Sequence, residues 1–401
     1  MQQGLKEKIK QRDFKLQSLL DITKAINADV HIDALLALYQ NILVEQLLIG
    51  KILLVSTQEN PFQNLIIHGF EDAQRWHPII EESNKKNKAK IETTEANGTQ
   101  VVIVPIEKDG LPIAFVILGD NNEEALSVSP SIKHMRFVQT LTSVLIVAIQ
   151  NKKLIAENIA QAALKRELEL AAEMQNMLLP KLLPKTTELS VNAYYKSHGQ
   201  VGGDYYDFIE INNHEWICCM ADVSGKGVSA AFLMAGLQAQ LRGLIDVHGN
   251  HLEKIVAALN AKVLDSAQGE KFVTFFIGHF DSNSKIFSYI NCGHNPVIVY
   301  QHASSSWLSA QTPGLGIVEK LPHLSKKSLT IAAGTHLLLY TDGLVEVENE
   351  NLISFGENGV ERAFQQWGQK FSNESLIEMV TDFIGKMKFI DDIALLHIVI
   401  Q

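Results

Sequence analysis

Apolar residues recur at three- and four-residue steps in the first part of the chain. Residues 5–27 and 30–48 each carry such a stripe among polar positions, which predicts two amphipathic helices. The pattern then changes to short apolar runs rich in β-branched residues, which predicts strands at 51–56, 64–68, 100–106 and 111–118. The turn Glu107-Lys-Asp-Gly110 joins the last two strands as a hairpin. Residues 81–98 are polar and rich in lysine and glutamate, so we expect a loop or a poorly ordered excursion there.

A long helix is predicted to follow. Ser129 is suited to cap it, and Pro130 is suited to its first position. Apolar residues then continue at helical spacing over 132–179, until Pro180 ends the helix. A helix of this length cannot bury its stripe inside one small domain, so we expect a two-stranded coiled coil and a homodimer. The alternative is two helices broken near Asn151, each packed on its own domain.

The remaining chain mixes strand and helix patterns. Strand-like runs lie at 216–220, 272–280, 286–291, 296–300, 336–340 and 393–400. Helical runs lie at 229–247, 252–266, 359–367 and 374–384. Strands come in adjacent pairs, and so do helices. This order predicts an α+β fold of antiparallel sheets with helices on their outer faces, rather than an alternating βαβ fold.

Composition narrows the function classes. The chain has 401 residues, so two or three domains are expected, and a net charge of -10 argues against nucleic-acid binding. The three cysteines, Cys218, Cys219 and Cys292, do not suggest a disulfide framework, which favours a reducing cytoplasm. The N-terminus lacks the apolar core of a signal peptide, and the longest apolar stretch, 144–149, is far short of a membrane span. We therefore expect a soluble cytoplasmic protein.

Carboxylates stand at four turns of the C-terminal part. Asp222 ends a strand, Asp204 follows two glycines, Asp342 precedes a glycine, and Asp391 and Asp392 precede the last strand. A strand holds such a side chain rigidly, and a neighbouring glycine lets the backbone approach a ligand. Carboxylates without histidine or cysteine favour Mg²⁺ or Mn²⁺ over zinc. Each turn alone is more often structural, but together they predict a shared metal centre.

Five segments around these acids resemble, in order, the motifs of SpoIIE-type phosphatases, the bacterial branch of the metal-dependent (PPM) serine/threonine protein phosphatases. They are Val201-Gly-Gly-Asp-Tyr-Tyr-Asp-Phe208, Ala221-Asp-Val-Ser-Gly-Lys-Gly-Val228, Asn291-Cys-Gly-His-Asn-Pro296, Leu338-Leu-Tyr-Thr-Asp-Gly-Leu-Val-Glu346 and Asp391-Asp-Ile-Ala-Leu-Leu396. Residues 169–180 also resemble the helix that commonly precedes this domain. The N-terminal part resembles a GAF sensory domain more loosely.

The resemblance implies three regions. Residues 1–150 form a GAF-like α/β sensory or dimerisation domain, 151–184 a helical coiled-coil linker, and 185–401 a SpoIIE-type phosphatase domain. The last is expected to be an αββα sandwich of two antiparallel sheets flanked by helices, with metals between the sheets at one edge. A change in the sensor would reach the metal-binding turns through the linker. The N-terminal domain could bind a small molecule, a partner or nothing.

The resemblance also implies two Mn²⁺ or Mg²⁺ ions and a set of ligands. Asp222 bridges the ions, while the backbone carbonyl of Val223 and the side chain of Asp204 complete one site. Asp342 and Asp391 hold the other ion. The catalytic residues implied are therefore Asp204, Asp222, Asp342 and Asp391.

Asp392 replaces Asp391 as the ligand if the register slips by one. Two cations roughly 3.5–4 Å apart lower the pKa of a shared water, which attacks phosphorus without a side-chain nucleophile. The implied substrate is phosphoserine or phosphothreonine on a regulatory protein such as an anti-sigma-factor antagonist. The alternatives are an inactive scaffold that binds a partner through the same cleft, and a phosphohydrolase of small molecules.

Some positions depart from the family pattern or have structural interpretations. Family members often carry Arg-Pro-Ala before the Gly-Gly-Asp motif, whereas this chain has Lys196-Ser-His-Gly-Gln200, so an arginine clamp on phosphate is in doubt there. Ala394 stands where a threonine is common. Asp207 is expected to support the site or cap a turn, and His294 to shape its loop or to help protonate the leaving oxygen. Backbone donors in Ser224-Gly-Lys-Gly227 are suited to position an anion.

Overall fold

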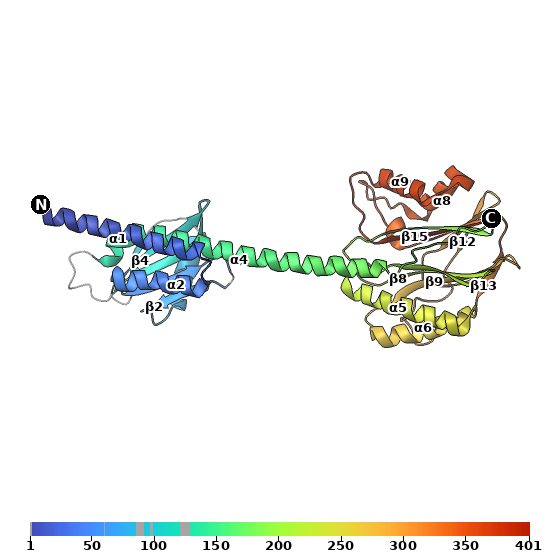
Figure 1. Ribbon diagram of the computed structural model, residues 1–401, viewed down its shortest axis with the longest axis horizontal. Helices are drawn as coiled ribbons and strands as arrows, with labels where there is room; N and C mark the ends of the chain where they lie inside the picture. The colour runs from blue at the N-terminus through green and yellow to red at the C-terminus, as the bar shows by residue number, and fades with distance from the viewer. Residues whose placement is uncertain (1, 60, 86–91, 97–98, 121–128) are drawn as a thin grey trace. The chain divides into compact units, whose positions relative to one another are not determined.

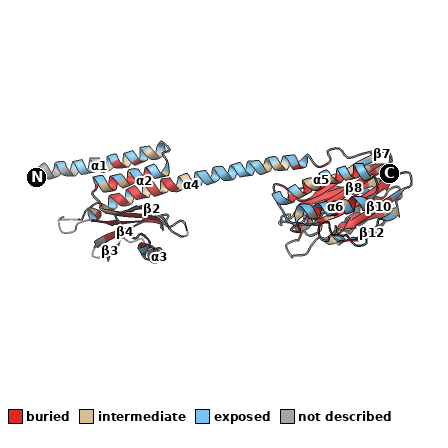
Figure 2. Cartoon of the chain, turned by 90° about the horizontal axis from the view of Figure 1, so that it is seen from below, coloured by how far each residue is buried: buried red, intermediate tan, exposed pale blue. Residues whose placement is uncertain are grey.

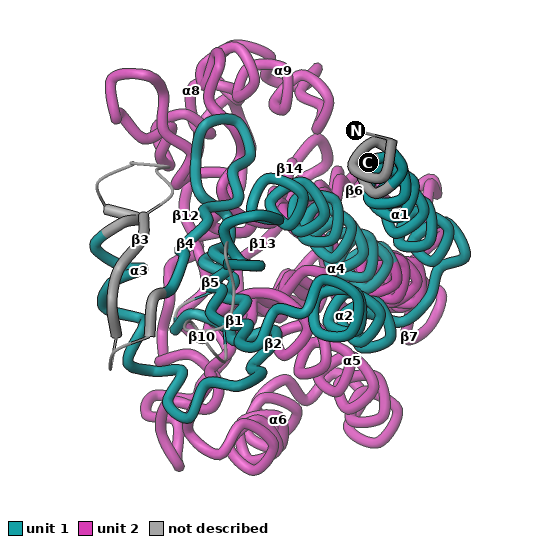
Figure 3. Tube along the Cα trace, turned by 90° about the vertical axis from the view of Figure 1, so that its left-hand side faces the viewer, with its two compact units in different colours: residues 1–162 teal, residues 163–401 magenta. Residues whose placement is uncertain are grey.

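The computed structural model describes residues 2–59, 61–85, 92–96, 99–120 and 129–401. The chain divides into two compact units, which we call unit 1 (Met1–Ala162) and unit 2 (Ala163–Gln401) (Figure 3). The boundary lies inside one continuous helix, α4 (Pro130–Asn176), which begins at the predicted proline (Figure 1).

Unit 1 is a five-stranded antiparallel sheet of order β2-β1-β5-β4-β3, packed between helices. The strands are β1 (Lys51–Ser56), β2 (Gln63–His68), β3 (Glu92–Ala96), β4 (Thr99–Lys108) and β5 (Leu111–Gly119). The other elements are α1 (Gln2–Asn27), α2 (Ile32–Asn41), a π-helical turn (Ile42–Gln46), a 3-10 turn (Gln74–Trp76) and α3 (His77–Lys85). Helices α1, α2 and α4 lie over one face of the sheet and α3 over the other (Figure 2).

The loop predicted at 81–98 is wrong in two places. Residues up to 85 belong to α3, and residues 92–96 form β3, which pairs with β4. The intervening residues 86–91 and 97–98 lie outside the described residues. Strand β3 is an edge strand, and the polar sequence Glu-Thr-Thr-Glu-Ala suits an edge because only one neighbour covers it.

Unit 2 contains two five-stranded antiparallel sheets, of order β13-β10-β9-β8-β7 and β12-β11-β14-β15-β6. The strands are β6 (Leu189–Lys196), β7 (Tyr205–Asn212), β8 (Glu215–Val223), β9 (Val273–Asp281), β10 (Ile286–Cys292), β11 (Val297–Gln301), β12 (Ser304–Leu308), β13 (Lys327–Thr330), β14 (His336–Tyr340) and β15 (Ile393–Ile400). The helices are α5 (Val228–His248), α6 (Leu252–Ala267), α7 (Asp342–Val345), α8 (Gly356–Trp367), a 3-10 turn (Gly368–Lys370) and α9 (Asn373–Ile384).

The two sheets of unit 2 face each other, with α5 and α6 outside the first and α8 and α9 outside the second (Figure 1). Strand β14 shows how the sequence builds these layers. Leu337 and Leu339 enter the core between the sheets, whereas Leu338 and Tyr340 pack under α8 and α9. This alternation is the period of two expected of a strand buried on both faces. The predicted α+β class with several antiparallel sheets is confirmed.

By length and hydropathy alone, α4 and α5 are apolar enough to cross a membrane. Core packing accounts for much of that hydropathy, since α5 contributes buried side chains such as Met234, Leu237 and Leu241 to the core of unit 2. The N-terminal half of α4 does the same in unit 1 through Val138, Leu141 and Leu145. These two helices are weak evidence for a membrane span.

Candidate metal centre

The acidic residues come from neighbouring ends of both sheets in unit 2. Asp204 directly precedes β7, and Asp222 lies at the end of β8, its antiparallel partner in the first sheet. Asp342 begins α7 directly after β14, and Asp391 and Asp392 directly precede β15, the partner of β14 in the second sheet. Because antiparallel neighbours begin and end at the same edge, the topology brings four distant segments together.

Thr341 connects the two sheets at this edge. Its hydroxyl donates to Asp204 Oδ2 at 2.7 Å and accepts from the backbone N–H of Ala394 at 2.9 Å. Asp204 and Thr341 are both buried. Thr341 therefore fixes one carboxylate oxygen of Asp204. Thr341 lies inside one of the motifs, but the sequence does not reveal this role because its partner lies 137 positions away.

The two acids before β15 have different partners. Asp392 accepts hydrogen bonds from the Ser197 hydroxyl (3.0 Å) and from the backbone N–H groups of His198 (2.7 Å) and Gly203 (2.8 Å). Asp391 instead makes an ion pair with Lys226, with 2.8 Å between Nζ and Oδ2. The carboxylate of Asp392 is thus engaged in holding the loop before β7, which favours Asp391 as the predicted metal ligand.

Glycines allow the backbone to close around the acids. A Cβ on Gly343 would overlap the carbonyl oxygen of Asp392, so only glycine lets α7 approach the turn before β15. A Cβ on Gly203 would lie 3.0 Å from the carbonyl oxygen of Val223. The Val223 carbonyl therefore lies beside the Gly-Gly-Asp turn, near Asp204, where the predicted ligand set needs it.

The acids repel one another, and burial shields them from water. Burial, followed by the nearby charge of Asp222, raises the pKa of Asp204 well above its usual range. Burial and the charges of Asp342 and Asp391 raise the pKa of Asp222 to about 7. Burial and the charges of Glu346 and Asp391 raise the pKa of Asp342 to about 6. A cation would relieve this repulsion, so the residues fit a divalent metal.

The acids do not form a preassembled cage. Among the described residues, no group of three or more His, Cys, Asp or Glu side chains is arranged to hold a metal ion. Mg²⁺ and similar hard cations commonly keep several waters and take only one or two carboxylates from the protein. The acidic edge of unit 2 has the chemistry of such a site.

Two other residues singled out from the sequence serve the fold. Asp207 is fully buried and accepts from Arg242, at 2.8 Å from Nε and 3.0 Å from the terminal nitrogen. His294 is buried, with Nδ1 2.8 Å from the hydroxyl oxygen of Thr274, and burial lowers its pKa to about 4. Thr274 pairs with Asp222 across β8 and β9, so His294 lies behind that strand end.

Gln175, near the end of α4, is a further residue that sequence analysis missed. Its side-chain amide donates to the carbonyl of Gly202 at 2.6 Å and accepts from the N–H of the same residue at 3.0 Å. The side chain is buried. This pair of hydrogen bonds attaches the end of α4 to the turn that carries Asp204.

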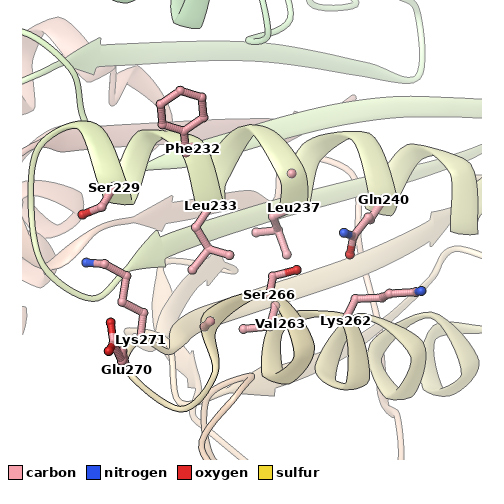
Figure 4. A pocket seen from close by; sticks show the side chains of 12 residues that line it. Ser229, Phe232, Leu233, Leu237, Gln240, Lys262, Val263, Ser266, Glu270 and Lys271 are labelled. Atoms are coloured by element: carbon pink, nitrogen blue, oxygen red, sulfur yellow. The ribbon is translucent and has the colours of Figure 1, made fainter.

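In unit 2, cavities lie near α5 or the acidic residues. One of about 380 Å³ lies between α5 and α6 (Figure 4). Lys271 at its rim donates to the carbonyl of Ser224 at 2.9 Å, in the loop that follows Val223. A second, apolar cavity of about 330 Å³ lies between the end of α4 and α5, beside Met174 and Phe232. A third, of about 270 Å³, is lined by Lys226 and Asp392 and so adjoins the acids.

Several known proteins are similar to this chain. Residues 212–401 match the model of the family described as Stage II sporulation protein E (SpoIIE). The phosphoserine phosphatase RsbU of Bacillus subtilis (strain 168) is 28% identical over 193 residues, which cover 48% of this chain and 57% of RsbU. The phosphoserine phosphatase RsbP of the same organism is 28% identical over 188 residues, or 45% of this chain and 46% of RsbP.

A solved structure gives the fold. The SiaA-PP2C domain of Pseudomonas aeruginosa superposes with a TM-score of 0.54 at 17% identity, covering 60% of this chain and 99% of that domain. The described sheets and helices therefore include a PP2C-type fold. The chain spans about half the length of the two curated relatives, 57% of one and 46% of the other.

Proposed function

We propose that this protein is a metal-dependent phosphatase that hydrolyses phosphoserine or phosphothreonine on a regulatory protein. The observation that carries the proposal is that Asp204, Asp222, Asp342 and Asp391 lie at one edge of the two sheets, where burial and neighbouring carboxylates raise the pKa values of Asp204, Asp222 and Asp342. The two relatives named phosphoserine phosphatases support the reaction class.

In this proposal Asp222 would serve both of two Mn²⁺ or Mg²⁺ ions. Asp204 and the Val223 carbonyl would serve one ion, and Asp342 and Asp391 would serve the other. When bound, such ions lower the pKa of water and neutralise charge on the phosphoryl group. The chain itself orients the ligands: Thr341 holds Asp204 from the opposite sheet.

The chain offers no cysteine nucleophile for a covalent alternative. Cys218, Cys219 and Cys292 are all buried in strands of unit 2. Burial raises the pKa of Cys218 and of Cys292 to about 12 and that of Cys219 well above its usual range. These thiols stay protonated near neutral pH and do not reach a substrate. This favours water as the attacking group.

The direct test is hydrolysis of a phosphoserine protein by the full chain with Mn²⁺ and with EDTA. We expect turnover only with the metal, and its loss on Asp222→Asn or Asp342→Asn. Glu348→Gln, an exposed acid beyond α7, is the matched control and should keep full turnover. Unchanged turnover in either aspartate variant would reject the assignment. Metal binding without turnover of any phosphoprotein would favour the inactive scaffold.

We further propose that unit 1 is a GAF-like sensor that regulates the site through α4, and that the substrate is an anti-sigma-factor antagonist or a similar small regulatory protein. The attachment of Gln175 to Gly202 supports a route from α4 to the Asp204 turn. The fragment 185–401 lacks Gln175, so its activity should differ from that of the full chain. Equal activity and equal oligomeric state in the two proteins would overturn regulation through α4.

A further inference from the structure

Lys226 lies directly against the acidic edge. Its ammonium is 2.8 Å from Asp391 Oδ2 and donates to the carbonyl of Ile390 at 2.7 Å. It also interacts electrostatically with Asp392 and Asp342. Three of the acids thus share this one cation, which partly neutralises the cluster. Within the described part of unit 2, no other lysine or arginine is ion-paired with these acids.

The surrounding backbone suits a side chain that changes partners. Lys226 stands between Gly225 (φ +84°) and Gly227 (φ +77°), in the loop between β8 and α5. Positive φ at both neighbours is the conformation that glycine adopts at little steric cost. The Lys226 side chain is 56% exposed, and ion pairs at exposed positions contribute little to stability. The contact with Asp391 is therefore weak enough to be exchanged for a stronger one.

A divalent ion and the ammonium compete for the same carboxylate. Asp391 is a ligand in the proposed metal site, and two cations near one carboxylate repel each other. When a metal engages Asp391, the ammonium loses its main partner and gains a repulsive neighbour. The Lys226 side chain is then expected to move away from Asp391.

The space available to the displaced ammonium is the cavity of about 270 Å³ next to the acids. Lys226, His198, Gly199 and Gln200 are among its lining residues. The same loop, residues 196–200, contains no arginine. Arg242 and Arg166 are already paired with Asp207 and Glu169. Lys226, which contacts the acids directly, is therefore placed to meet a dianionic phosphoryl group entering beside the metals.

We propose that Lys226 is an internal counter-cation of the metal centre: it pairs with Asp391, and a divalent ion bound by the acids displaces it to contact the phosphoryl group of the substrate. The inference rests on the proposed function and deepens it, because it assigns phosphate recognition to Lys226. It predicts opposite effects of Lys226 on metal binding and on phosphate binding. A residue with only a structural role would not produce that pair of effects.

The test compares Lys226→Gln with the wild-type full chain. Titration calorimetry with MnCl₂, without substrate, should show Mn²⁺ binding about 2–5-fold tighter in the variant, because the competing charge is gone. Inhibition of the Mn²⁺-loaded protein by inorganic phosphate should weaken about 5–10-fold, since a charged hydrogen bond to phosphate is lost. KM for a phosphoserine protein should rise by a similar factor.

Two further variants complete the experiment. Lys226→Arg keeps the charge and should restore both affinities towards wild type, whereas Lys262→Gln, an exposed lysine of α6, should change neither. Unchanged or weaker Mn²⁺ binding in Lys226→Gln overturns the proposal, and so does unchanged phosphate inhibition. If wild type hydrolyses phosphoprotein with Mn²⁺ while Lys226→Gln shows neither shift, only this inference fails. If wild type lacks metal-dependent hydrolysis, the proposed function fails instead.

Discussion

At the scale of single residues, Asp222 shows a conflict between stability and function. Its folded pKa of about 7 lies above the ordinary 3.8, so between these pH values the folded chain binds more protons than the unfolded chain. The free energy of unfolding therefore falls as pH rises from about 4 to about 7. Asp222→Asn removes the ionisable carboxyl group and, with it, this fall in the free energy of unfolding. At pH 8 in EDTA we expect the variant to be more stable than wild type by roughly 1–3 kcal/mol: each pKa unit is worth about 1.4 kcal/mol, and solvent screening at the half-buried Asp222 removes part of the total.

The measurement is urea unfolding of both proteins at pH 8 and pH 5, with EDTA or with Mn²⁺. The advantage of Asp222→Asn should shrink at pH 5, where the wild-type carboxyl is largely protonated. Mn²⁺ should stabilise wild type but not the variant, which reverses their order. A variant less stable than wild type at pH 8 in EDTA would show that hydrogen bonding, not repulsion, dominates at this position.

Asp207 illustrates the opposite case, an acid fully compensated within the fold. Besides Arg242, it accepts from the Tyr205 hydroxyl at 2.6 Å and from the N–H of Phe208 at 2.9 Å. Arg242→Met leaves a buried carboxylate without its counter-charge, so the free energy of unfolding should fall by about 3 kcal/mol. Arg362→Met removes an exposed arginine of α8 and should change it by less than about 0.5 kcal/mol.

The same variant also tests whether Asp207 only supports the fold or belongs to the metal site. Mn²⁺ affinity measured by calorimetry should stay within twofold of wild type in Arg242→Met. A large loss of Mn²⁺ binding without loss of stability would instead place Asp207 in the metal centre.

The sequence predicted the acids of the site better than the residues that hold them. The acids stand at turns next to glycine or at strand ends, which is a local signal. Thr341, Lys226 and Gln175 act on partners 137, 164 and 27 positions away. No spacing within one segment reveals such contacts, because they exist only once the strands are paired.

At the scale of elements, α4 does more than connect the two units: its last turn is hydrogen-bonded to the turn that carries Asp204. Gln175→Ala removes both hydrogen bonds to Gly202 and frees the turn that carries Asp204. We expect Mn²⁺ affinity to fall about tenfold, since a loss of about 1.4 kcal/mol corresponds to that factor. Titration calorimetry on the full chain measures it.

Gln161→Ala, an exposed glutamine of the same helix, is the control and should bind Mn²⁺ like wild type. Gln175→Glu keeps the acceptor for the Gly202 N–H but loses the donor to its carbonyl, so an intermediate affinity is expected. Wild-type affinity in Gln175→Ala would show that the turn holds its shape without α4.

The strands that sequence analysis did not predict share one property. They are β3, β6, β7, β12 and β13, and every one is at the edge of its sheet. An edge strand has one neighbour and often carries polar side chains, so its hydrophobic pattern is weak. Strand β12, with the sequence Ser-Ser-Ser-Trp-Leu, shows this clearly. The inner strands of unit 2, buried on both faces, were all predicted.

At the scale of the whole molecule, the two units differ in what their sequences disclose. Unit 2 carries motifs whose chemistry needs particular residues at particular turns, and the family match lies within it. Unit 1 has the patterning of a sheet with helices on both faces, which many functions can share. Its architecture follows from the pattern, whereas its proposed role as a sensor depends on α4, the element that runs through both units.

The predicted homodimer rests on that same helix. Its exposed apolar side chains include Ile155, Ile159, Leu170 and Met174, which are separated by four or eleven residues and so lie along one side. Pairing with a second copy would remove this surface from water. We expect the full chain to sediment as a dimer at micromolar concentration.

Ile159→Glu combined with Leu170→Glu should convert the dimer to a monomer, because paired helices would bury uncompensated charges. Gln161→Glu combined with Lys165→Gln changes net charge by the same amount on the opposite side of α4, and it should stay dimeric. Sedimentation velocity distinguishes the two states. A wild-type monomer at every concentration would exclude the coiled coil, and dissociation of both variants would place the interface elsewhere. If the dimer also holds α4 in position for Gln175, the monomeric variant should show the same loss of Mn²⁺ affinity as Gln175→Ala.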